Sequence, residues 1–178
     1  MIALEPPPGE TGAQAPGVAS DFVAMFESHY RRVVRALELG GLDHASAEDA
    51  AQEAFARTLG HWRRVRGGSN PPGYVFRTAF RLARRRLATR ELPLDEVPLP
   101  ANDAGGIELR LDVEAELAAM PARRRACAVL CLVVGLSTAE AASALGIAEG
   151  TVRKQLEHAR RALRAALSEA SPPLPPAP

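Results

Sequence analysis

An acid-free block of arginines and aromatic residues is the part of this sequence best suited to bind a polyanion. Residues 54–90 hold ten arginines, no aspartate or glutamate, and five of the eight aromatic residues. Arginines neutralise phosphates and release their counterions, and an exposed aromatic ring can stack on an unpaired base for about 1 to 3 kcal/mol. The candidate contact residues are Trp62, Tyr74, Arg77, Arg81, Arg84 and Arg85.

A simpler interpretation places these arginines on a solvated face and the aromatic rings in a core. Helical spacing favours the core for Phe55, Phe76 and Phe80, whereas Trp62 and Tyr74 fit either role. For the arginines phosphate binding is favoured, because the block contains no acid that could pair with them.

A second candidate binding element lies nearer the C-terminus. Ser137–Glu140 is a capping box that starts a short helix, and Gly146 ends it. The longer helix that follows turns an apolar stripe inward from Val152 to Leu163, which completes a helix-turn-helix pattern. Arg153 could hydrogen bond guanine in the major groove, and a basic helix facing water is the alternative. The outward residues are Thr151, Arg153, Lys154, Glu157, His158 and Arg161.

The elements that must position these residues are helices in two separate bodies. Residues 1–19 and 170–178 are rich in proline and are expected to be disordered tails. Residues 91–107 combine prolines, glycines and acids without periodicity, which predicts a flexible linker. We therefore expect an all-α fold with two small helical domains, residues 20–90 and 108–169.

Three helices are expected in the first domain. Apolar residues recur at intervals of three and four from Phe22, and Gly40–Gly41 ends that run. Ser46 is expected to cap the second helix, with Asp49 as the carboxylate three residues later. The third helix follows a loop that extends through Gly73.

The second domain is expected to contain an apolar helix over Arg123–Val134, after a break at Pro121. Cys127 and Cys131 lie on this helix and are expected to be buried, reduced thiols. The arginines at its start, Arg123–Arg125, could contact backbone phosphates or face solvent, and both roles remain open.

The charge changes sign along the chain although the net charge is only +1. Residues 1–53 carry −6, residues 54–90 carry +10, residues 91–122 carry −7 and residues 123–178 carry +4. Two basic blocks separated by an acidic connector indicate two surfaces that face a polyanion, which the acidic segments could also mask within the molecule.

Several functional classes are excluded by composition and spacing. The longest apolar run has 11 residues, against about 20 for a membrane span, and no secretion signal is visible. A cytoplasmic protein without membrane insertion is therefore expected. The histidines show no ligand spacing and no catalytic motif occurs, so we expect no metal, no cofactor and no enzymatic activity.

Two segments of the chain resemble one protein family. LDHASAEDAAQEAFARTLGHW, followed by Asn70–Pro71 and residues 74–79, resembles region two of bacterial RNA polymerase sigma factors of the small extracytoplasmic-function group. Residues 120–167 resemble region four of the same group, most specifically in GLSTAEAASALGIAEGTVRKQLEHARRAL. Together the segments cover residues 20–168 in the order that the family has.

The resemblance implies an alternative sigma factor. Such a protein docks on core RNA polymerase, helps open promoter DNA at the minus-ten element through region two, and reads the minus-thirty-five element through region four. It has no catalytic site of its own, and an anti-sigma factor that covers the same surfaces is a further candidate partner.

The resemblance also implies roles for particular residues. The helix that carries Asp49, Gln52, Glu53 and Phe55 corresponds to the one that contacts the polymerase, although alone Glu53 and Arg57 make only an exposed pair worth about 0.2 to 0.5 kcal/mol.

The loop over residues 66–73 corresponds to the segment that captures a flipped base. Asn70 could bond such a base, and an ordinary turn is an equal alternative.

Three residues depart from the family pattern. Gly73 replaces a bulky residue, Arg81 replaces an asparagine, and Ala148 replaces a serine that caps the recognition helix. Loss of a helix cap costs about 0.5 to 2 kcal/mol. Together the three departures predict weaker or less stringent promoter opening and a divergent member with its own promoter preference.

Two other functions fit parts of the sequence. The first is a helix-turn-helix regulator that never joins the polymerase, and the second is a helical enzyme that uses Cys127 or a histidine. The sigma-factor interpretation requires two separate cationic modules. Arginines buried against carboxylates, or one continuous core through both halves, would contradict this interpretation.

Overall fold

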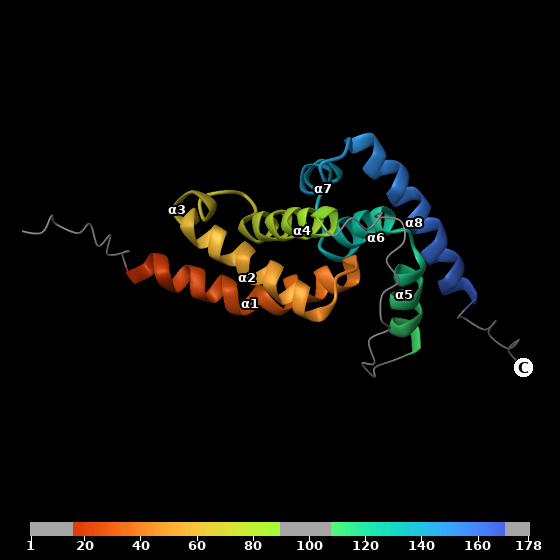
Figure 1. Cartoon of the computed structure of the whole chain (residues 1–178), viewed down its shortest axis with the longest axis horizontal. Helices are drawn as coiled ribbons and strands as arrows, with labels where there is room; N and C mark the ends of the chain where they lie inside the picture. The colour runs from red at the N-terminus through yellow and green to blue at the C-terminus, as the bar shows by residue number, and fades with distance from the viewer. Residues whose placement is uncertain (1–15, 90–107, 170–178) are drawn as a thin grey trace, which may run out of the picture.

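The computed structural model describes residues 16–89 and 108–169, and its regular elements there are all helical (Figure 1). The elements are α1 (Pro16–Gly40), α2 (His44–Gly60), α3 (Trp62–Val65), α4 (Pro71–Thr89), α5 (Glu108–Ala119), α6 (Ala122–Ala128), the π-helical turn η1 (Val129–Val133), α7 (Thr138–Leu145) and α8 (Glu149–Glu169). This confirms the all-α fold.

The expected tails and linker fall mostly outside the described residues. The linker at 91–107, the C-terminal tail at 170–178 and residues 1–15 all lie there. One correction applies to the tail expected over residues 1–19, because α1 already begins at Pro16. Proline suits the first turn of a helix, where its missing N–H has no partner to lose.

The first half of the molecule, α1 to α4, is built around an alanine-rich helix. α2 packs against both α1 and α4. The side chains that it buries include Ala47, Ala50, Ala51 and Ala54, all fully inaccessible to solvent. Small side chains let helix axes approach closely, so α2 can lie tightly against two neighbours at once.

The start of α2 differs from the expectation. The N-cap is Asp43, whose carboxylate accepts a hydrogen bond from the Ser46 N–H at 2.9 Å, so Ser46 itself lies in the first turn. Gly41, at a φ of 115°, turns the chain sharply after α1 and brings Asp43 into the capping position.

The second half, α5 to α8, follows the expected boundaries closely. Ser137 and Glu140 form the predicted capping box, and Gly146 ends α7 in the left-handed conformation. The apolar helix expected over residues 123–134 begins one residue earlier and finishes as the η1 turn. Gly135, at a φ of 84°, ends it.

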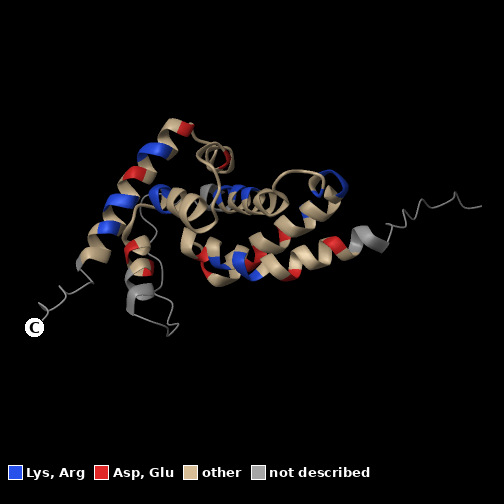
Figure 2. Cartoon of the chain, turned by 180° about the vertical axis from the view of Figure 1, so that it is seen from behind, with Lys and Arg blue, Asp and Glu red and all other residues tan. Residues whose placement is uncertain are grey.

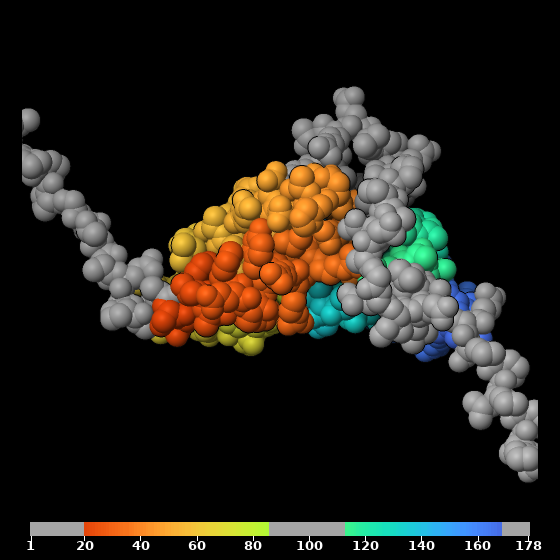
Figure 3. Space-filling model, turned by 90° about the horizontal axis from the view of Figure 1, so that it is seen from below, coloured from red at the N-terminus to blue at the C-terminus, as the bar shows by residue number. Residues whose placement is uncertain are grey.

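The two helical domains are present as predicted, but they pack on one another, so the expectation that they share no core is wrong. α4 lies against α7, and α1 contacts α6 and η1. Val33 and Phe80 of the first half belong to the same buried cluster as Leu130, Leu145 and Val152 of the second half. Figure 3 shows orange atoms of the first half directly against cyan atoms of the second.

Among the residues that the structure describes, two ion pairs cross the seam between the halves. Arg35 of α1 pairs with Glu114 of α5, and Arg77 of α4 pairs with Glu140 of α7. A sequence pattern identifies a buried stripe on α4 but does not identify the helices that cover it. For that reason the sequence predicted a core confined to one half.

A smaller buried cluster joins α5 to α8. It contains Leu117, Met120, Ala128 and Ala159, and it holds α8 along the outer edge of the second half (Figure 1). Within the described ranges, no helix combines the length and apolar character that crossing a bilayer requires.

Candidate nucleic-acid interface

α8 presents a cationic face beside a buried apolar stripe. Val152, Leu156 and Ala159 are buried, as the helical spacing predicts. Figure 2 shows basic residues recurring along α8. The structure places Arg153, Lys154 and Glu157 in solvent and leaves Thr151 and His158 half-buried.

Contacts with α7 fix the start of α8. The Thr138 hydroxyl donates a hydrogen bond of 2.6 Å to the carboxylate of Glu149, the first residue of α8. Ala148, which precedes it, accepts bonds from Thr151 and Val152 through its backbone carbonyl alone. Glu149 therefore supplies the negative charge that the helix N-terminus favours, although Ala148 has no capping side chain.

The cationic face of α8 continues further than the sequence motif indicates. A groove of about 640 Å³ runs along it, and Thr138 of α7 lies at one side. Sequence reasoning missed Arg160 and Arg164, although they lie three and seven residues after Glu157 and therefore on the same face of the helix. The arginines that line the groove are Arg153, Arg160, Arg161 and Arg164.

The arginine stripe of α4 is divided between solvent and the seam. Arg81 and Arg85 are exposed. Arg84 is half-buried against Gly146, where an added Cβ would lie 2.5 Å from its Nη1 atom. Arg77 bonds the Glu140 carboxylate at 2.5 Å, so the expectation that these arginines lack acidic partners is wrong for Arg77. The acid comes from the other half and from a distant part of the sequence.

Glu140 has two partners at once. Its carboxylate accepts bonds from the Ser137 N–H at 3.0 Å and the Ser137 hydroxyl at 2.9 Å, while it also pairs with Arg77. The backbone N–H of Ser137 is the main reason that the pKa of Glu140 is lowered, and the Ser137 hydroxyl and the Arg77 charge lower it further. One carboxylate thus caps α7 and fastens α4 to it.

Trp62 is a core residue, which corrects its assignment as a DNA contact. Only 5% of its surface is exposed, and its ring meets Phe22 edge-on at a centroid distance of 5.3 Å. A ring enclosed in this way has no face for a base. Tyr74 is half-buried in the first turns of α4, packed against the same core.

Asn70 caps α4. Its side-chain oxygen accepts a hydrogen bond of 2.8 Å from the Gly73 N–H, and its backbone carbonyl accepts one from Tyr74. A Cβ at residue 73 would lie 2.3 Å from the Asn70 side-chain nitrogen. The glycine at this position, one of the three departures from the family pattern, therefore makes room for the cap.

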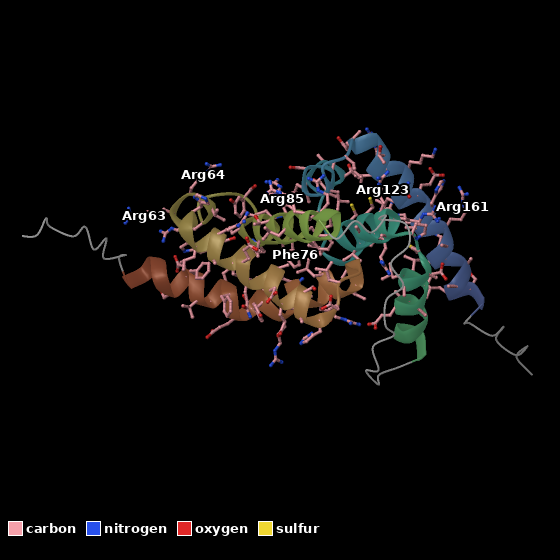
Figure 4. All side chains as sticks on the ribbon, in the orientation of Figure 1. Arg63, Arg64, Phe76, Arg85, Arg123 and Arg161 are labelled. Atoms are coloured by element: carbon pink, nitrogen blue, oxygen red, sulfur yellow. The ribbon has the colours of Figure 1, made fainter. Side chains whose placement is uncertain are left out.

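Arginines around α3 add to the cationic surface of the first half. Arg63 and Arg64 are exposed and extend away from the helices at the α3 end of the molecule (Figure 4). Arg66 is also exposed and pairs with Asp21 of α1 at 3.2 Å. Arg63 and Arg64 belong to the acid-free block, but they were not predicted as contacts because they are not part of a helical stripe.

The polar face expected to contact a large protein partner lies on α2. Asp49 and Gln52 are exposed, and Gln52 donates a hydrogen bond to the Tyr30 hydroxyl of α1 at 3.4 Å. Glu53 is half-buried and pairs with Arg57, as the sequence predicts.

Phe55 is only 2% exposed and its ring packs in the core, which confirms the position that its helical spacing predicts and removes it from the expected protein-contact set. Two apolar residues of α1 are exposed and were not predicted as contacts: Val23 is 50% exposed and Phe26 is 37% exposed.

Arg125 has a different environment from its neighbours. It is only 2% exposed, and its Nε atom has no hydrogen-bond partner in the described part of the chain. Its Nη1 atom donates a hydrogen bond of 3.3 Å to the Ala118 carbonyl, and its guanidinium packs over Gly41. Burial lowers its pKa. Neither role expected for this arginine, phosphate contact or solvation, fits that position.

The two cysteines have poor access and weak acidity. Cys127 is fully buried, and burial raises its pKa to about 11. Cys131 is half-buried, with its pKa also raised by burial. A protonated, enclosed thiol is a poor nucleophile, so the enzyme alternative gains no support from Cys127.

Two family models match the chain, one to each half. Sigma-70 region 2 matches residues 25–92, and Sigma-70, region 4 matches residues 110–163.

Curated proteins with related sequences cover nearly the whole chain. The ECF RNA polymerase sigma factor SigE of Mycolicibacterium smegmatis is 32% identical over 187 aligned positions, which cover 94% of this chain and 72% of the relative. The ECF RNA polymerase sigma factor SigL of Mycobacterium tuberculosis is 34% identical over 158 positions, which cover 82% of this chain and 88% of the relative.

Solved structures share the fold. The sigma factor RpoE, in complex with the anti-sigma factor NepR from Bartonella quintana, superposes with a TM-score of 0.61 at 21% identity, covering 84% of this chain and 98% of that one. CnrH, in complex with the cytosolic domain of CnrY, gives a TM-score of 0.55 at 22% identity, covering 86% and 91%.

Proposed function

Because this chain belongs to the sigma-70 family, in its extracytoplasmic-function group, we propose that it binds core RNA polymerase and directs promoter recognition and DNA opening. The observation that carries this function is the presence of both regions, in family order, in one chain. A sigma factor acts by binding and strand separation, and this action belongs in the cytoplasm with the polymerase and the DNA.

The second half reads the minus-thirty-five element through α8. Arg153 and Lys154 project from its first turns, where a recognition helix meets base edges in the major groove. Arg160, Arg161 and Arg164 extend the same face and suit the phosphates beside those bases. Thr151, Glu157 and His158 complete the proposed contact surface.

The first half holds the minus-ten region through its exposed arginines. Arg81 and Arg85 project from α4, and Arg63 and Arg64 project from α3. Arg77 joins this surface once Glu140 releases it. With Trp62 buried, Tyr74 is the remaining aromatic candidate for contact with an unpaired base, and Asn70 lies beside it at the helix start.

Promoter binding requires the halves to separate. Elements centred near positions minus ten and minus thirty-five lie about 25 base pairs apart, roughly 85 Å along B-DNA at 3.4 Å per base pair. In the packed structure Arg77 bonds Glu140 of α7, the helix that packs against α8. Both DNA-binding surfaces therefore lie in one place, and they can reach both elements only after the seam opens on the polymerase.

The polymerase contact surface is the face formed by α2 and the neighbouring part of α1. Asp49, Gln52 and Glu53 supply polar groups, while Val23 and Phe26 supply exposed apolar area. A polar face with apolar anchors beside it is the usual composition of a protein interface. An anti-sigma factor is the second proposed protein partner, since both solved relatives were crystallised or determined with their own partners bound.

Run-off transcription tests the function. Purified full-length protein would be mixed with core polymerase that lacks any sigma factor and with fragmented genomic DNA, and the 5′ ends of the transcripts would be sequenced. We expect discrete start sites that share upstream elements. DNA binding without any association with core polymerase would instead identify a plain helix-turn-helix regulator.

A further inference from the structure

A cavity of about 220 Å³ lies in the seam between the two halves, apart from the DNA and polymerase surfaces. Its wall is largely apolar and comes from both halves. The first half contributes Leu42, Phe80 and Arg84, and the second half contributes Arg123, Leu145 and Ile147.

Two guanidinium groups border this cavity without acidic partners. Neither Arg84 nor Arg123 forms an ion pair with a carboxylate among the described residues, and the Nε atom of Arg84 is buried without a hydrogen-bond acceptor. Elsewhere along the same seam, Arg35 and Arg77 each pair with a glutamate from the other half. Because no carboxylate neutralises either guanidinium, an anion in the cavity would gain a favourable Coulomb interaction with both.

The size and the wall define the class of ligand. At about 30 Å³ for each water-sized group, 220 Å³ holds roughly seven such groups. An apolar wall with cations at its border suits a molecule with one charged end and one apolar end. We propose that the seam cavity binds a small amphipathic monoanion, a carboxylate with an aromatic or short aliphatic body, whose charge meets Arg84 and Arg123.

Such a ligand would hold the two halves together. Its binding site exists only while Leu42 and Phe80 face Leu145 and Ile147, so binding favours the packed state over the separated one. This consequence for transcription rests on the proposed function, whereas the binding site itself rests on the cavity and the two arginines.

Benzoate is a suitable probe, with benzyl alcohol as its uncharged counterpart. Each would be titrated into the isotope-labelled full-length protein, and the amide signals of Gly40, Ala83 and Gly146 would be followed by NMR. We expect saturable shifts with benzoate and at least tenfold weaker binding of benzyl alcohol. Arg84→Gln should remove most of this difference, because the amide keeps much of the bulk but not the charge.

Matched variants keep the result interpretable. Arg31→Gln removes an exposed arginine of α1 outside the cavity and should leave benzoate binding unchanged. If Arg84→Gln fails to fold, as judged by circular dichroism, Arg123→Gln tests the same charge from an exposed position.

Equal binding of the two probes, an absence of saturable shifts, or full benzoate affinity in both arginine variants would overturn the proposal. The titration contains no polymerase and no DNA, so its failure is distinct from a failure of run-off transcription.

Discussion

The two halves expose their cations differently, although each carries one basic helix at its surface. On α8 the arginines line an open groove, and Arg161 pairs with Glu157 one turn away. On α4 the stripe is partly engaged by the other half, with Arg77 on Glu140 and Arg84 against Gly146. In the packed state the arginines of α8 are thus open to solvent, whereas Arg77 and Arg84 of α4 are engaged at the seam.

The buried stripe of α4 packs against helices of both halves. Phe80 and Ala83 are 4% and 3% exposed because α4 serves two neighbours, the rest of the first half and α7. Because α4 packs within its own half and also against α7, some of its charged residues are covered. The second half places α8 at the outside and avoids that conflict.

The largest expected effect concerns the shared core. Leu130→Ala removes a fully buried side chain from the cluster that both halves share, and should lower the free energy of unfolding by about 2 to 5 kcal/mol. Urea unfolding followed by circular dichroism and by Trp62 fluorescence measures it. Because Trp62 lies in the first half, both signals should shift together.

Leu167→Ala is the control for that change, since Leu167 is 38% exposed and should leave stability nearly unchanged. Two separate transitions, with the Trp62 signal unaffected by Leu130→Ala, would contradict a common core and restore the expectation of independent bodies.

The next effect concerns recognition by α8. Arg153→Ala should reduce discrimination at one base pair of the minus-thirty-five element by about 1 to 3 kcal/mol, through loss of a major-groove hydrogen bond. Competitive binding to a set of single-base promoter variants measures it. Arg160→Ala should instead weaken binding to all of them alike and reduce its salt dependence, as expected of a phosphate contact. If Arg153→Ala ranks the promoter variants in the same order as the wild-type protein, Arg153 does not contact a base.

The seam ion pair should have a smaller effect. Glu140→Gln keeps a side chain that can complete the capping box but removes the charge that holds Arg77. We expect promoter opening to become severalfold faster, because a partly exposed pair contributes at most about 1 kcal/mol. Permanganate reactivity of the minus-ten thymines follows the rate.

Ser137→Ala provides the contrast for this measurement. It removes the N-cap hydroxyl at about 0.5 to 2 kcal/mol of stability while Glu140 keeps its charge, so opening should not gain speed in the same way. Slower opening with Glu140→Gln would show that the pair assists initiation.

The smallest effect is a dependence on pH. The pKa of Glu140 is lowered in the folded state from an ordinary value of 4.5, so its contribution to stability is present above that pH and is lost as the pH falls through the lowered pKa. Between pH 6 and about pH 3 the melting temperature should therefore fall less steeply in Glu140→Gln than in the wild-type protein. Parallel curves would place the lost stability at other carboxylates.

Local chemistry made most of the helices predictable. The Ser137 capping box, Gly146 and the inward stripe of α8 depend on residues a few positions apart, and the structure confirms them. The prediction of Ser46 as the cap of α2 was wrong, because Asp43 is an equally good capping residue and the turn at Gly41 places it at the helix start.

Contacts between distant residues were the part that sequence reasoning could not supply. Trp62 is buried by Phe22, forty positions earlier in the chain, and Arg77 is paired by Glu140 of the other half. Periodicity shows that a face is covered but not by what. The expected DNA contact Trp62 failed for this reason, whereas Arg153 and Lys154 remain exposed at the surface.

The enclosed position of Arg125 bears on how easily the molecule changes shape. This guanidinium lies between α6 and the turn at Gly41, shut away from water and supported by a single carbonyl. When the halves move apart it recovers its hydration shell, and that gain offsets part of the apolar contact that is lost. This gain lowers the free energy needed to separate the halves, which is the step that the proposed function requires on the polymerase.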